Sequence, residues 1–157
     1  MKKTAFILTV VLIMSLLCAC GSGSAKDPGL GAVADAVAGA VGNDEMMQVD
    51  ANYIENMLKL SPDDYAECIV KLSNVGTNID EFGIFKGADE KQAQAIETAL
   101  KDYLGFRLGV WMEEYLPEEF PKLQNAEVRA EGNYVFYAIV GDDIRSSVNS
   151  AFADSFK

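Results

Sequence analysis

The sequence predicts an α+β domain with an antiparallel sheet of about four strands, packed on a long central helix and a C-terminal helix. Three observations carry this prediction: four short extended runs, one long apolar stripe at helical spacing, and a two-residue turn joining the last two runs. The chain has 157 residues, of which half are hydrophobic, so one domain with one core is expected.

The folded domain is expected to begin near Met46 with a short helix. Asp50 is a suitable N-cap, and the apolar residues that follow share one helical face: Tyr53, Ile54, Met57 and Leu58. Next, Ser61-Pro62-Asp63-Asp64 combines a capping hydroxyl, a proline at the first helical position and acids in the first turn. This motif predicts a single helical turn.

Two extended runs follow at about Ala66–Leu72 and Ile79–Lys86, and the turn-forming residues 73–78 between them predict antiparallel pairing. Cys68 falls on the more apolar face of the first run, which favours a small buried hydrophobe. A reactive Cys68 would need a nearby lysine or helix N-terminus, because the chain has no histidine.

A long helix is predicted to start after Asp89, the expected N-cap, with Gln92 three residues on in a capping-box-like arrangement. The helix is expected to end at or before Pro117, because proline disrupts the interior of a helix. We expect its apolar stripe to organise the core and Trp111 to pack against the sheet. The stripe comprises Ile96, Leu100, Leu104, Leu108, Trp111 and Tyr115.

The last two extended runs, Ala126–Glu131 and Tyr134–Gly141, are joined by Gly132-Asn133, which predicts a hairpin. Residues 134–140 are apolar on both faces, as in a central strand. A final helix, capped by Asp142 or Asp143, completes the order helix, two strands, long helix, two strands, helix.

The N-terminus has the pattern of an export signal. Two lysines precede an apolar run at Ala5–Leu17, which is shorter than a membrane-spanning helix. The run ends in Leu17-Cys18-Ala19-Cys20, which resembles the lipobox of bacterial lipoproteins. The resemblance implies cleavage before Cys20 and lipid attachment to it; the alternative is an ordinary secretory peptide.

Three segments are therefore expected: a signal peptide at 1–19, a lipid-anchored Gly/Ala-rich tether at 20–45, and the α+β domain at 46–157. A weak helix is conceivable between Gly31 and Ala40, but the stretch offers few large side chains, so we place it outside the core. The expected location is the extracytoplasmic face of a bacterial cell membrane, held there by lipid on Cys20.

Composition excludes several classes of function. A net charge of −11 repels phosphate backbones and argues against a nucleic-acid partner. With no histidine, triad catalysis and His-ligated metal sites are impossible within the chain. There is no EF-hand-type loop, so we expect no cofactor and no metal.

Pairs of neighbouring acids are the only catalytic equipment that the sequence offers, and two carboxylates suffice for a glycoside hydrolase. Capping and solvent exposure explain most of them, so a carboxylate-dependent hydrolase acting on envelope or extracellular glycans is the alternative. Such pairs occur at Asp63-Asp64, Asp80-Glu81, Glu113-Glu114, Glu118-Glu119 and Asp142-Asp143.

Glu81 stands out because it sits in an otherwise apolar strand, where an unpaired charge is costly. Arg107 on the long helix is a candidate partner. Three arrangements are open: an exposed edge position with Arg107 independently solvated, a structural ion pair between the two, or a ligand contact.

Several motifs together resemble a domain-of-unknown-function family of small lipoproteins from Gram-positive, Firmicutes-type bacteria. They are Ser61-Pro62-Asp63-Asp64-Tyr65, residues 79–85, Tyr115-Leu116-Pro117-Glu118-Glu119, Gly132-Asn133-Tyr134-Val135 and the helix start at Asp142-Asp143. The family usually carries an acid in strand two and a base in the long helix, which Glu81 and Arg107 match. The resemblance implies location and domain type, and we expect a noncatalytic binding or accessory module with an envelope or protein partner.

Overall fold

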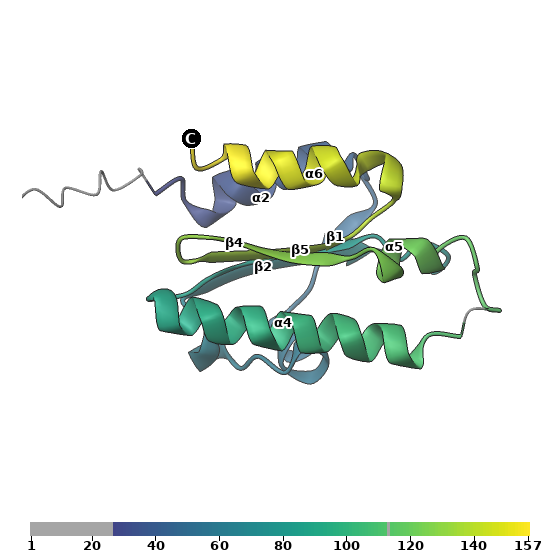
Figure 1. Ribbon diagram of the computed structural model, residues 1–157, viewed down its shortest axis with the longest axis horizontal. Coiled ribbons are helices and arrows are strands. Elements are labelled where there is room, and N and C mark those ends of the chain that lie inside the picture. Colours follow the sequence, from purple (N-terminus) through teal and green to yellow (C-terminus); the bar gives the residue numbers. More distant parts are fainter. Residues whose placement is uncertain (1–26, 113) are drawn as a thin grey trace, which may run out of the picture.

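The computed structural model describes residues 27–112 and 114–157, and it has three layers. Figure 1 shows the sheet in the middle, with α2 and α6 covering one face and α4 covering the other. The elements in chain order are α2 Leu30–Val41, β1 Met46–Gln48, α3 Ala51–Tyr53, the π-helix η1 Ile54–Leu58, the 3-10 helix η2 Pro62–Asp64, β2 Glu67–Ser73, β3 Glu81–Lys86, α4 Glu90–Val110, α5 Phe120–Gln124, β4 Glu127–Glu131, β5 Tyr134–Ile139 and α6 Asp142–Asp154.

The sheet confirms the α+β class and its antiparallel pairing. It has five strands in the order β1-β2-β3-β5-β4, one more than the four expected. The additional strand, β1, is three residues long and pairs with the end of β2 at the sheet edge, which is too short for a recognisable alternation of apolar residues. The two predicted hairpins form, and β3 pairs with β5 at the centre.

The central strand β5 is buried at every position, as its uniformly apolar sequence predicts. Alternate residues face opposite layers: Val135, Tyr137 and Ile139 face α4, whereas Phe136 and Ala138 face α2 and α6. The sheet therefore separates two hydrophobic cores.

The long helix α4 begins as predicted, because the Asp89 side chain accepts a hydrogen bond from the backbone N–H of Gln92 at 2.8 Å. Its apolar stripe is buried only as far as Leu104. Leu108 and Tyr115 are exposed, and the helix ends at Val110, before Pro117. The expectation that the whole stripe is core is wrong for Leu108 and Tyr115. The helix has ended before Tyr115, so helical spacing no longer determines where that side chain lies.

Trp111 caps the C-terminus of α4 rather than continuing it. The side chain is half-buried and packs against the core on the α4 side of the sheet. Its indole N–H is buried and has no hydrogen-bond partner among the described residues.

The assignment of residues 30–41 to a tether outside the core is wrong. These residues form the helix α2, which packs against α6 and the sheet (Figure 1). Its apolar residues recur at helical spacing and line the second core: Leu30, Val33, Ala34, Val37 and Val41. Gly42 ends the helix at a φ of 64°, a conformation that glycine adopts without strain.

The short caps follow the sequence closely, with one exception. Asp50 accepts from the Tyr53 N–H at 2.9 Å, and the Asp64 carboxylate accepts from both the N–H and the hydroxyl of Ser61 at 2.7 Å. The N-cap of α6 is Gly141, not Asp142 or Asp143. These two acids lie in the first turn of the helix, where their negative charges interact favourably with the helix dipole.

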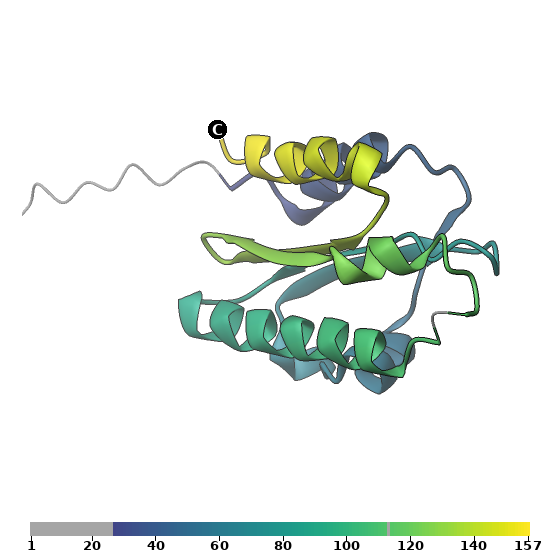
Figure 2. The same ribbon diagram turned by 45° about the vertical axis from the view of Figure 1, so that its right-hand side comes forward.

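The two ends of the domain are chemically different. At one end Asp27 accepts hydrogen bonds from Lys86 and Tyr134, which lower the pKa of its carboxyl group and place it beside the β4–β5 turn. At the opposite end lies the loop that follows α4, as Figure 2 shows. The expected signal peptide and Cys20 lie outside the described residues, and no described helix is long and apolar enough to cross a membrane.

Because α2 completes the second core, a charge placed on its inner face should unfold the domain. Val37→Asp buries an unpaired carboxylate at a fully buried position and should lower the free energy of unfolding by at least about 3 kcal/mol. Ala36→Asp adds the same charge at an exposed position of the same helix and should change it by less than about 0.5 kcal/mol. Urea denaturation of residues 27–157, which contain every described helix and strand, measures the free energy of unfolding of both variants. Equal losses from the two substitutions would contradict the assignment of α2 to the core.

Candidate functional site

A buried carboxylate lies at the centre of the α4 face of the sheet. Glu81, at the start of β3, is only 2 % exposed. Its Oε1 accepts hydrogen bonds from the hydroxyl groups of Tyr103 at 2.7 Å and Tyr137 at 2.6 Å. Its Oε2 accepts from Nη1 of Arg107 at 2.9 Å, and the same nitrogen donates to the Tyr103 oxygen at 2.7 Å. We call these four residues the Glu81 centre.

The fold brings the four side chains together by simple geometry. Tyr103 and Arg107 are one helical turn apart on α4 and so share a face. Tyr137 lies opposite Gly83 in the β3–β5 register, two residues from Glu81 on the same face. A Cβ atom on Gly83 would lie 2.3 Å from the Tyr137 ring, so only glycine lets that ring lie across β3 and reach the carboxylate.

Burial determines the charges at this centre. It raises the pKa of Tyr103 and of Tyr137 well above the usual tyrosine value, and the Glu81 carboxylate raises them further. Both phenols are therefore neutral donors at neutral pH. The guanidinium of Arg107 balances the one remaining negative charge.

Of the three arrangements left open by the sequence, the structure shows the ion pair between Glu81 and Arg107. Sequence reasoning missed Tyr103 and Tyr137. Tyr103 and Tyr137 are 22 and 56 residues away from Glu81 along the chain, so no local pattern connects them to it. The one available signal was a pair of tyrosines on apolar faces, whose hydroxyls need partners when buried.

Two crevices lie next to the Glu81 centre. The larger, between η1 and α4, has a volume of about 630 Å³ and is lined by Asn56, Met57, Leu58, Lys59, Ala99, Asp102, Tyr103 and Phe106. The smaller, of about 240 Å³, is lined by Tyr53, Met57, Leu72, Ser73, Asn78, Ile79, Asp80, Glu81 and Arg107. Met57 is the one residue that lines both crevices.

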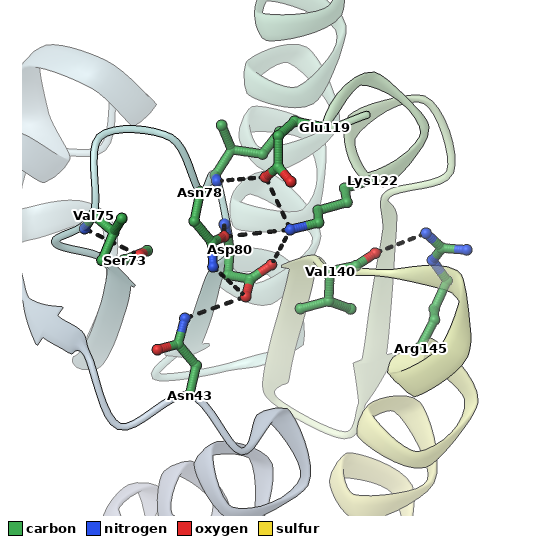
Figure 3. A network of polar contacts seen from close by, with 10 residues as sticks. Asn43, Ser73, Val75, Asn78, Asp80, Glu119, Lys122, Val140 and Arg145 are labelled. Atoms are coloured by element: carbon green, nitrogen blue, oxygen red, sulfur yellow. Dashed lines mark hydrogen bonds and ion pairs between the residues drawn. The ribbon is translucent and has the colours of Figure 1, made fainter. Parts of the chain in front are cut away.

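A second polar cluster closes the end of the sheet. Figure 3 shows Nζ of Lys122 donating to Asp80 at 2.9 Å and to Glu119 at 2.9 Å. Asn43 and Asn78 donate to the other Asp80 oxygen. Glu119 also accepts from the backbone N–H of Ile79. These contacts tie α5 and the segment after α2 to the loop that leads into β3.

Cys68 is half-buried beside the core of the α4 face, in agreement with its predicted packing role. Burial raises the pKa of its thiol, which keeps it protonated at neutral pH and makes it a poor nucleophile. Within residues 27–112 and 114–157, no three Cys, Asp or Glu side chains gather in a group that could hold a metal ion.

A family model described as a domain of unknown function, DUF4358, matches residues 40–140. The chain belongs to the DUF4358 family. The match spans the whole sheet and α4, and therefore all four residues of the Glu81 centre. No curated protein and no solved structure matches the chain.

In this DUF4358 domain, removing the charge of Glu81 should lower stability far more than removing the charge of a partly exposed surface acid. Glu81→Gln leaves the partly buried Arg107 without its counter-charge and should lower the free energy of unfolding by about 3 kcal/mol or more. Glu97→Gln breaks a surface pair with Lys101 and should cost less than about 1 kcal/mol. Urea denaturation of both variants measures the difference, and similar losses would show that the buried pair has no special role.

The Glu81 centre also predicts loss of stability in alkali. Above about pH 10 the unfolded chain releases its tyrosine protons, whereas the folded chain retains those of Tyr103 and Tyr137 because their pKa values are raised. The unfolded state then binds fewer protons, so stability falls with rising pH, by about 1.4 kcal/mol per pH unit for each group. Tyr137→Phe should make the slope shallower, as measured by denaturation at a series of pH values.

Proposed function

We propose that the chain is a lipid-anchored lipoprotein of the extracytoplasmic membrane face, acting as a noncatalytic binding or accessory module. The support for the anchor is the sequence Leu17-Cys18-Ala19-Cys20, in which Cys20 is the residue that the resemblance marks for acylation. We include in this proposal that the chain is one of the small lipoproteins of Gram-positive, Firmicutes-type bacteria.

The observation that carries the binding role is a group of exposed apolar side chains at one end of the domain. Val110, Met112 and Tyr115 are 58 %, 69 % and 61 % exposed. We call them the distal patch, because they lie at or just after the C-terminal end of α4, which is at the opposite end of the domain from the β4–β5 turn (Figure 1). Asp27 lies beside that turn, where it accepts a hydrogen bond from Tyr134. All three lie within residues 110–115, and contiguous apolar exposure is typical of interaction surfaces.

The position of the patch relative to the anchor supports display toward a partner. Residues 21–26 separate Cys20 from Asp27, so the lipid lies within about 25 Å of Asp27. The helix α4 starts next to the β4–β5 turn, where Gly87 donates to the carbonyl of Asn133, and it runs about 30 Å to the patch. Asp27, to which the proposed tether connects, and the distal patch are therefore at opposite ends of the domain.

The engagement of the buried acids supports a noncatalytic role over the alternative of a carboxylate-dependent hydrolase. Both oxygens of Glu81 accept hydrogen bonds, and so do both oxygens of Asp80. Glu119 is paired with Lys122. A general acid or a nucleophile needs a carboxyl group that can reach substrate, and these three hold the fold together instead.

The test uses the full chain in its own cells, with a photo-crosslinking amino acid in place of Val110. The protein should fractionate with the membrane, Cys20→Ala should release it, and illumination should give a discrete adduct with a partner. The same amino acid at Ser147, an exposed position on α6, is the matched control and should give none.

Each arm has its own contradicting result. Membrane retention of Cys20→Ala would overturn lipid anchoring. Equal adducts from positions 110 and 147 would overturn the distal patch as a binding surface. The purified protein should not release sugars from envelope glycans. If it did, and if substitution of one acid abolished this activity, the result would contradict the noncatalytic role and support the carboxylate-dependent hydrolase.

A further inference from the structure

The larger crevice opens onto a strip of exposed apolar side chains along α4. Ala99 and Phe106 line the crevice from α4, and Met57 lines it from η1. Phe106 is 59 % exposed. Val110 follows Phe106 by one helical turn, so the apolar surface continues from the crevice to the distal patch. We call Ala99, Phe106 and Val110 the α4 strip.

The geometry of the α4 strip suits a second helix. Ala99, Phe106 and Val110 stand at i, i+7 and i+11, so they form a row along the axis of α4 that is about 17 Å long, or about three helical turns. Both walls of the crevice are helical, and they offer no open strand edge with which an extended chain could pair. An occupant must therefore satisfy its own backbone hydrogen bonds, as a helix does.

Two glycines of α4 are not explained by packing within the domain. Gly105 and Gly109 stand three residues after Asp102 and Phe106, respectively, and so flank the strip. Glycine lowers the stability of a helix relative to alanine. A Cβ atom at either position would meet no described atom within 4 Å, so the fold itself does not require them. Glycine permits the close approach of another backbone, which fits a helix that packs on α4 from outside.

The charges around the α4 strip favour a basic occupant. Glu114 and Glu118 are exposed in the segment that carries Tyr115, and neither forms an ion pair with a described residue. In the larger crevice, Lys59 offsets the charge of Asp102. The two acids beside Tyr115 therefore leave an excess of negative charge, in a chain whose net charge is −11. Complementary charge on a partner would make association faster and more specific.

The same acids argue against two other occupants. A second copy of the chain would bring its own Glu114 and Glu118 to the interface, and an anionic bilayer would repel them. We propose that the α4 strip binds a basic amphipathic helix of a partner protein. The apolar face of that helix lies on Phe106 and Val110, and its lysine or arginine side chains lie beside the two acids. This inference names the kind of partner for the proposed function and rests on it.

Fluorescence anisotropy of a labelled leucine–lysine peptide of about 15 residues tests the proposal on residues 27–157, which contain both hydrophobic cores. Leucines at i, i+3, i+4 and i+7 give the peptide one apolar face, and it should bind with saturation at one equivalent. A leucine–glutamate peptide of the same pattern reverses the charge, and a permuted leucine–lysine peptide keeps the charge but loses the apolar face. Each should bind at least about tenfold more weakly.

Two pairs of variants locate the binding surface. Phe106→Ser should weaken binding about tenfold, whereas Val75→Ser changes an exposed apolar residue outside the strip and should leave the affinity within about twofold. Gly109→Gln fills the space beside the strip with a better helix former, so it should weaken binding at least about fivefold without lowering the urea midpoint. Gly39→Gln makes the same change at an exposed position of α2 and should leave binding unchanged.

Several results would overturn the proposal. They are the absence of saturable binding, equal binding of the three peptides, and equal effects of a variant and its control. A dimer of this chain that Phe106→Ser dissociates would also overturn it, because the occupant would then be a second copy.

Photo-crosslinking in the full chain, in its own cells, separates this inference from the proposed function. The photo-crosslinking amino acid in place of Phe106 should capture the same partner as it does in place of Val110. An adduct from position 110 alone would overturn the α4 strip and leave the distal patch as the binding surface. The absence of an adduct from either position would overturn the proposed function and this inference with it.

Discussion

The fold depends on the burial of both faces of its central strands. Every residue of β5 is buried, and in β3 only Lys86 is partly exposed. A sheet with two apolar faces needs a layer on each side, because either face left open would expose a large hydrophobic surface. The helix α4 provides one layer, and α2 and α6 together provide the other. The family match at 40–140 begins within the last turn of α2 and ends before α6, so these two helices belong to the architecture although most of their residues lie outside the match.

Within that frame the Glu81 centre brings a buried charge pair to the core on the α4 face. Its four side chains satisfy one another with short hydrogen bonds, which makes the arrangement tolerable in a low-dielectric setting. The arrangement also restricts the backbone, since Gly83 must lack a side chain for the Tyr137 ring to fit. It links β3, β5 and α4 at one point, and two of its members, Glu81 and Arg107, line the smaller crevice.

Much of this architecture could be predicted from local patterns, because caps, turns and alternation act within a few residues. The Asp50 and Asp89 caps and the Gly132-Asn133 hairpin are examples. The failures have physical reasons. In α2 the apolar residues have the correct spacing, but they are small, and small side chains suggest a tether when the layer that they contact is unknown. At Leu108 the apolar periodicity continues although the side chain is exposed, so burial depends on a neighbouring layer that the pattern cannot report. The tyrosines of the Glu81 centre come together only through strand register and helix placement.

The edge strand β4 has a consequence for how copies of this protein behave beside one another. Its outer edge is unpaired and its sequence is Glu127-Val128-Arg129-Ala130-Glu131. If two copies joined their β4 edges antiparallel in the longest register, Glu127 of each would face Glu131 of the other, and the two Arg129 side chains would face each other. Every charged side chain would thus lie opposite a side chain of the same charge. Such self-repulsion lets neighbouring molecules crowd on a surface without fusing their sheets into a continuous ribbon.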